Sequence, residues 1–174
     1  LTADAVVAGL GILPNIELAR AAGLDLDLGG IVVDDHLRSS DPDIWAAGDV
    51  ATFPAPALGR HLRVEHENAA VTTGRLAGLN MAGQATAYAE LPFFYSDLFD
   101  LGYEAVGILD ARLETVEQWV TPYREGVVYY LEGGRVRGVL LWNTWGQVDA
   151  ARALIAAPGP FDAASVRGRL PAEG

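Results

Sequence analysis

The apolar and polar positions in the first part of the chain predict a short α/β unit. Residues 4–8 form an apolar run that we expect to be a buried strand, followed by a corner rich in Gly and Pro. We expect a helix to begin at Asn15, a favourable N-cap residue, and to end at Gly23. Its apolar face comprises Ile16, Ala19 and Ala22.

Alternation with a period of two dominates the next segment. Leucines alternate with acids over residues 24–28, and two glycines separate this run from the apolar residues 31–33. This pattern predicts a hairpin-like pair of strands. A further short strand is expected at residues 44–46, after a polar turn, and residues 51–59 read as a Pro-rich, uncharged loop that packing keeps ordered.

A long helix is predicted over residues 65–82. Two acids, Glu65 and Glu67, fall in its first turn, where the positive end of the helix dipole favours them. Small or apolar residues recur at steps of three and four, which predicts a helix sandwiched between other elements. These residues are Ala70, Gly74, Ala77 and Met81.

The character of the sequence changes at residues 84–90, which resemble a linker. Beyond it, residues 127–131 and 136–142 flank Gly133-Gly134 and form the clearest hairpin pattern in the chain. A short helix is predicted over residues 147–157, and residues 158–174 read as a tail.

Composition excludes several classes of function. The 174 residues are 51% hydrophobic and 20% charged, which suits a packed core, and the formal net charge of −11 disfavours nucleic acid as a partner. No uncharged apolar run approaches the roughly 18 residues of a membrane span, and no signal peptide is visible. Cysteine is absent and the three histidines have no metal-ligand spacing, so we expect no metal site. A cytoplasmic location is expected, and the lack of an initiator Met predicts a start inside a longer polypeptide.

Four stretches follow one another in an order that points to a family. They are VVAGLGILPNIELARAAGL, GGIVVDDHLRSSDPDIWAAGDVATFP, RVEHENAAVTTGRLAGLNMAG and LPFFYSDLFDLGYEAVGILD. Together they resemble the C-terminal part of FAD- and NAD(P)-dependent pyridine nucleotide-disulphide oxidoreductases. The resemblance is strongest to the branch of apoptosis-inducing factor and the ferredoxin, rubredoxin and putidaredoxin reductases, and it covers residues 5–145.

This resemblance implies a fold class and a domain organisation. The expected fold is α/β plus α+β, a remnant of a flavoprotein reductase with two dinucleotide-binding domains. Residues 1–22 would end the NAD(P)-binding domain and residues 23–86 would form the last part of the FAD-binding domain. Residues 87–174 would form an antiparallel-sheet C-terminal domain that makes interface or dimer contacts. Neither G-x-G-x-x-G fingerprint occurs here, so both are expected upstream.

The resemblance also assigns candidate site residues. The acid Asp49, after Gly48, would accept hydrogen bonds from the ribityl hydroxyls of FAD; from the sequence alone it could equally cap a surface turn. His66 begins a helix whose dipole would stabilise negative charge on the reduced flavin, and we assign it no proton transfer. Tyr95 would stack near the nicotinamide, where relatives carry Trp, although it also suits a core strand. The full expected set is Gly48, Asp49, Val50, Glu65, His66, Ala69 and Tyr95, with Gly9, Gly11 and Pro14 on the NAD side.

Two functions remain open at this point. The resemblance implies an oxidoreductase that passes electrons from NAD(P)H through FAD to a ferredoxin-like protein or a small oxidant. We expect the 174-residue chain alone to be inactive and free of cofactor, and no residue is assigned as catalytic. The alternative is a non-enzymatic module that forms homodimers through apolar faces.

Overall fold

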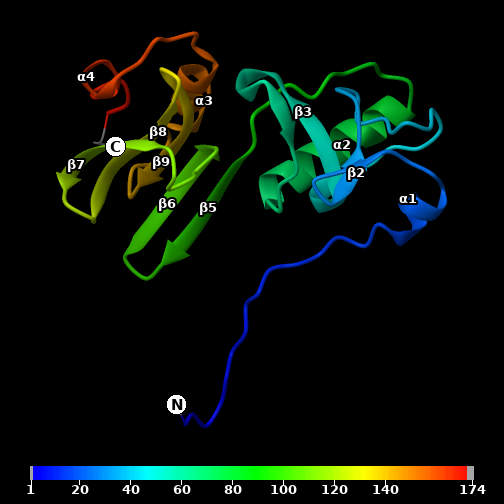
Figure 1. The fold of residues 1–174 in the computed structure, drawn as a ribbon, viewed down its shortest axis with the longest axis horizontal. Helices are drawn as coiled ribbons and strands as arrows, with labels where there is room; N and C mark the ends of the chain where they lie inside the picture. Colours follow the sequence, from blue (N-terminus) through cyan, green and yellow to red (C-terminus); the bar gives the residue numbers. More distant parts are fainter. Residues whose placement is uncertain (1, 172–174) are drawn as a thin grey trace.

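The computed structural model describes residues 2–171, and it contains two separate β-sheets. The first has four strands in the order β1-β2-β3-β4, and the second has five in the order β5-β6-β9-β8-β7. The sheets lie side by side, with the long helix α2 packed beside the first (Figure 1). The mixed architecture with an antiparallel second sheet confirms the expected fold class.

The first sheet is built from short strands: β1 (Leu26–Asp27), β2 (Gly30–Val32), β3 (Ala51–Ala55) and β4 (Arg60–Leu62). Strands β1 and β2 form the predicted antiparallel pair, whereas β2 and β3 run parallel. The loop prediction for residues 51–59 is wrong, because β3 and the 3-10 turn η2 (Pro56–Leu58) occupy it. Its apolar residues are buried between neighbouring strands, so the ladder extends through them. Residues 44–46 contribute only an isolated bridge between Arg38 and Trp45.

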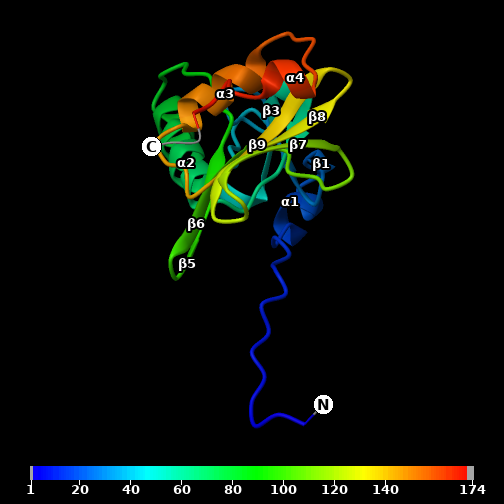
Figure 2. The ribbon, with the colours of Figure 1, turned by 90° about the vertical axis from the view of Figure 1, so that its left-hand side faces the viewer.

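The N-terminal segment is extended and carries no strand. The predicted strand at residues 4–8 is wrong, since a strand needs a neighbour to bond its backbone and none lies beside this segment among residues 2–171. Figure 2 shows the segment projecting away from the rest of the chain. Helix α1 (Glu17–Ala21) follows as predicted, but its N-cap is Ile16 and not Asn15.

Helix α2 (Glu67–Met81) confirms the predicted long helix. The residues that it buries are Ala69, Thr73 and Ala77, which are spaced four apart on one face. Of the predicted small-residue stripe, Ala77 is buried and Ala70 is half-buried, but Gly74 and Met81 are exposed, so the prediction of the packed face is wrong in part. The predicted face differs from the buried face because Thr73 is buried, although a threonine counts as polar in the sequence pattern.

The second sheet is wholly antiparallel. Its strands are β5 (Phe93–Leu98), β6 (Leu101–Gly107), β7 (Glu114–Thr121), β8 (Glu125–Glu132) and β9 (Arg135–Trp142). The predicted hairpin is confirmed as β8 and β9. Gly133 and Gly134 join them with φ angles of 57° and 72°, a conformation that glycine adopts without strain.

The C-terminal residues pack against the second sheet. Helix α3 (Val148–Ala156) confirms the predicted short helix, and α4 (Ala163–Val166) follows it. The tail prediction is wrong for the described part, because Asp162 caps α4 and both Val166 and Leu170 are buried. The last residues of the predicted tail, 172–174, lie outside the described residues.

Each half has its own hydrophobic cluster, and residues of the first half also enter the cluster of the second. Leu58 from η2 and Leu91 from the connecting segment lie in the same buried cluster as Val139 and Ile155 of the second half. Arg137 of β9 donates a hydrogen bond to the carbonyl of Leu58 across this contact, at 3.0 Å. These contacts join the first sheet to the second.

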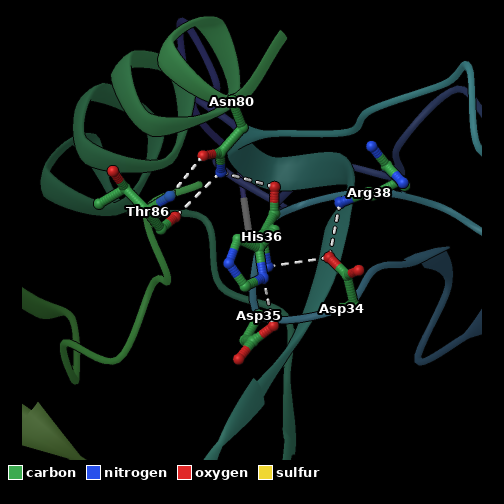
Figure 3. A network of polar contacts seen from close by, with 6 residues as sticks. All are labelled: Asp34, Asp35, His36, Arg38, Asn80 and Thr86. Atoms are coloured by element: carbon green, nitrogen blue, oxygen red, sulfur yellow. Dashed lines mark hydrogen bonds and ion pairs between the residues drawn. The ribbon is translucent and has the colours of Figure 1, made fainter. Parts of the chain in front are cut away.

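A polar network holds the far end of α2 (Figure 3). Asn80 donates to the carbonyls of His36 and Thr86, at 2.8 and 3.0 Å. Asp34 accepts hydrogen bonds from the backbone N–H groups of His36 and Arg38, which closes a turn. Side-chain ligand atoms of Asp34, Asp35 and His36 lie within 4.8 Å of one another, an exposed arrangement that this turn accounts for.

Candidate functional site

The acid Asp49 lies in a 3-10 turn, η1 (Gly48–Val50), directly beside α2. Gly48 has a φ of +71°, which disfavours any other residue. Its N–H donates to the hydroxyl of Thr73 at 2.9 Å, and this hydroxyl donates to the carbonyl of Ala69 at 2.6 Å. Thr73 is fully buried, so it locks the turn onto the first half of the helix.

Arg63 fixes the same turn from the other side. Its guanidinium donates to the carbonyl of Asp49 at 3.0 Å and to the carboxylate of Glu65 at 3.1 Å. A third bond, 2.8 Å long, reaches the carbonyl of Leu28. Arg63 and Thr73 were both missed from sequence, and the only available signal was their presence inside the RVEHENA and AVTTG stretches.

The start of α2 is open. Its N-cap residue, His66, provides no side-chain hydrogen bond to the free N–H groups of the first turn. The His66 ring lies 4.5 Å from the ring of Phe94, and its Nδ1 atom is buried without a partner among residues 2–171. Burial lowers the pKa of His66, and the charges of Asp49 and Glu65 oppose that shift.

A hollow of about 320 Å³ opens at this helix start. One wall consists of Glu65, His66, Glu67 and Asn68, and the other of Phe93, Phe94 and Tyr95 from β5. The Tyr95 hydroxyl donates to Glu67 at 3.3 Å across the hollow, and the charge of Glu67 raises the pKa of Tyr95. Tyr95 remains 53% exposed, so one face of its ring is accessible.

The expected site residues therefore fall into three groups. Glu65, His66 and Tyr95 line the hollow together. The exposed Asp49 stands close enough to influence the pKa of His66, and its carboxylate has no hydrogen-bond partner within residues 2–171. Gly48 and Val50 flank it in η1, and Ala69 lies on the buried face of α2. Gly9, Gly11 and Pro14 lie in the extended N-terminal segment, which the structure does not bring to this hollow.

This arrangement suits an extended ligand with polar groups along one side. Open N–H groups and the positive end of the dipole favour a partial negative charge at the start of α2. The carboxylate of Asp49 accepts hydroxyl donors, and the accessible face of Tyr95 accepts a flat ring. The residues present thus fit a flavin dinucleotide, and the unsatisfied Nδ1 of His66 is the independent sign that a polar partner belongs here.

Comparisons with known proteins identify the family of this chain. Residues 1–74 match the pyridine nucleotide-disulphide oxidoreductase family, and residues 77–122 match the apoptosis-inducing factor, mitochondrion-associated, C-terminal family. The chain is 42% identical to the ferredoxin–NAD(+) reductase component of the anthranilate 1,2-dioxygenase system of Burkholderia cepacia, over 89% of this chain and 38% of that protein. The chain belongs to the pyridine nucleotide-disulphide oxidoreductase family.

Two further comparisons agree with this family assignment. It is 39% identical to apoptosis-inducing factor 1 of Dictyostelium discoideum, over 87% of this chain and 31% of that protein. A crystal structure of a covalent putidaredoxin reductase–putidaredoxin complex superposes with a TM-score of 0.78 at 34% identity, covering 90% of this chain and 37% of that one. The chain therefore spans about a third of the length of the relatives that it matches. Among residues 2–171, no helix has the length and apolar character of a membrane span.

Proposed function

We propose that this chain forms one wall of the FAD site of an oxidoreductase that takes electrons from NAD(P)H. The observation that carries the proposal is the open start of α2, where His66, with an Nδ1 atom that has no partner among residues 2–171, lines a hollow with Glu65 and Tyr95, close to the charge of Asp49. Bound FAD would supply the redox chemistry by accepting hydride from the nicotinamide and passing electrons on. The chain's own residues bind and orient it.

Each residue has a separate role in this proposal. Asp49 accepts hydrogen bonds from the hydroxyl groups of the ribityl chain, in a position that Arg63 and Thr73 hold fixed. The first turn of α2, beginning at His66, stabilises the negative charge of a reduced flavin ring through its open N–H groups. Tyr95 covers the nicotinamide side, and its bond to Glu67 restrains the ring. None of these residues is assigned a proton transfer.

The domain assignment and the acceptor belong to the same proposal. Residues 1–22 end an NAD(P)-binding domain, residues 23–86 complete the FAD-binding domain, and residues 87–174 form the C-terminal domain. The acceptor is a ferredoxin-like protein or a small oxidant, supported by the relative named as a ferredoxin–NAD(+) reductase component. Since this chain forms only one wall of the site, the chain by itself is inactive and colourless. The protein works in the cytoplasm.

Substitution of Asp49 tests the site. In a flavoprotein that contains this chain, Asp49→Ala removes an acceptor for a cofactor hydroxyl and weakens FAD binding by about 1–3 kcal/mol, or roughly 5- to 150-fold in Kd. Flavin release is measured by fluorescence after dialysis. The matched control is Asp43→Ala, an exposed acid outside the hollow, which leaves FAD retention unchanged. Full retention in Asp49→Ala would remove Asp49 from the site.

A second candidate function is a module for self-association. Apolar side chains of the N-terminal segment are strongly exposed, and such surfaces mark interfaces. They are Val6, Val7, Leu10 and Leu13. Sedimentation measures the oligomeric state of the 174-residue chain and of its Val7→Asp and Leu10→Asp variants. A homodimer that dissociates in both variants supports self-association, and a monomeric chain rejects it.

A further inference from the structure

A second hollow lies on the second sheet, and the flavin proposal does not use it. It has a volume of about 340 Å³ and lies over β7, β8 and β9, on the face opposite α3. Aromatic side chains dominate its walls, and its floor contains Val128 and Leu140. The aromatic residues are Trp119, Tyr123, Tyr130 and Trp142.

The strand register explains why a hollow forms at this place. Trp119 of β7 pairs with Gly126 of β8, and Gly126 in turn pairs with Trp142 of β9. The two indoles therefore stand in one cross-strand row, with a residue that has no side chain between them. A β-carbon on Gly126 would lie 2.7 Å from Cε3 of the Trp119 ring, so no larger residue fits there.

Neighbouring aromatic rings hold these walls in place. Tyr103 stacks on Trp142, with 5.8 Å between ring centroids and an interplanar angle of 8°. At the other side, the Trp119 and Tyr123 rings lie 5.5 Å apart. The hollow is thus bordered by supported π faces.

The electrostatics of this hollow favour a positive charge. Glu117 is the one ionised side chain among its lining residues, and its Oε2 atom accepts a 2.6 Å hydrogen bond from Nε1 of Trp119. Burial raises the pKa of Tyr130, and the charge of Glu117 adds to this shift. Aromatic faces beside a carboxylate attract cations, and methylated ammonium groups are the ligands that such aromatic cages bind.

One polar atom indicates what else the ligand carries. The indole N–H of Trp142 is buried and has no acceptor among residues 2–171. A buried donor without a partner is costly, and a ligand oxygen would satisfy it.

We propose that this hollow binds a small organic cation that carries a methylated ammonium group and an oxygen acceptor. The ammonium group contacts the faces of Trp119 and Tyr130 beside Glu117, and the oxygen accepts from Trp142. The proposal is independent of flavin binding, because none of these residues lines the hollow at the start of α2.

Choline is a suitable probe, and two close analogues isolate its features. 3,3-Dimethyl-1-butanol has the same shape without the charge, and tetramethylammonium has the charge without the hydroxyl. Binding to the full 174-residue chain is followed by tryptophan fluorescence and by calorimetry at low salt. Choline is expected to bind at least about 5-fold more tightly than the neutral analogue, as a cation–π contact of about 1 kcal/mol requires. Equal binding of the neutral analogue would overturn the proposal.

Substitutions in the chain give a second test. Glu117→Gln keeps an acceptor for Trp119 but removes the charge, and it should weaken choline binding several-fold while the neutral analogue is unaffected. Trp142→Phe keeps a ring but removes the donor, so it should abolish the preference for choline over tetramethylammonium. Circular dichroism and melting temperature establish that each variant is folded. Unchanged choline binding in folded Glu117→Gln, or an unchanged preference in folded Trp142→Phe, would refute the assignment.

Discussion

His66 links the charge of the candidate flavin site to the stability of the chain. Because burial lowers its pKa below 6.5, the unfolded chain binds a proton more readily than the folded chain does. The free energy of unfolding should therefore fall as the pH drops below about 6.5, with the full loss reached below the lowered pKa of His66. His66→Asn should reduce this pH dependence. Urea denaturation at about pH 7.5 and about pH 5.5 measures it, and an identical pH dependence in the variant would contradict the prediction.

Thr73 is the residue on which the position of Asp49 depends. Thr73→Val has a similar shape but leaves the N–H of Gly48 without its acceptor, so we expect a loss of about 1–3 kcal/mol in the free energy of unfolding. Thr73→Ser keeps the hydroxyl and is the matched control. Chemical denaturation of both variants checks the prediction, which fails if Val and Ser cost the same.

At the scale of elements, the C-terminal segment offers a test of its packing. Leu170 is only 2% exposed and belongs to the core of the second sheet. Leu170→Ala should lower the free energy of unfolding by about 2–4 kcal/mol, because it leaves a cavity. Arg167→Ala, an exposed position three residues earlier, should have little effect on thermal stability. Similar melting temperatures for the two variants would mean that the segment does not contribute to the core.

Elements whose signals are local were predictable, and elements that depend on distant partners were not. Helix α2 and the β8–β9 hairpin follow from their own periodicity and turn residues. The sequence predicts a loop at strand β3 because it contains a proline and several small residues, but the strand forms because β2 and β4 flank it. The N-terminal strand failed for the opposite reason, since its apolar residues find no neighbouring strand within the described chain.

The same distinction applies to the candidate site. The family resemblance placed Glu65, His66 and Tyr95 together, although β5 lies far along the chain from the start of α2. Arg63 and Thr73 were missed because their roles are bonds to backbone atoms of η1, which no residue pattern encodes. The candidate contact residues follow from a sequence motif, whereas the residues that support η1 are visible only after folding.

At the scale of the whole molecule, residues of the first half that enter the core of the second join the two sheets. Leu58, which is 2% exposed, extends from the first half into the core of the second, and Arg137 bonds its carbonyl. Leu58→Ala should lower the free energy of unfolding by about 2–4 kcal/mol, and it should do so in both sheets at once. Hydrogen exchange with mass spectrometry reports on β3 and β8 separately.

The control for this coupling is Val71→Ala on the exposed face of α2, which should change neither region. If Leu58→Ala accelerates exchange only in β3, the sheets unfold independently. In that case the core of the second sheet does not hold the β5 wall of the hollow at the start of α2 in place. If exchange rises equally in β3 and β8, the whole molecule maintains the geometry of the hollow at the start of α2. Mutations in the second sheet are then expected to alter FAD binding at the proposed site from a distance.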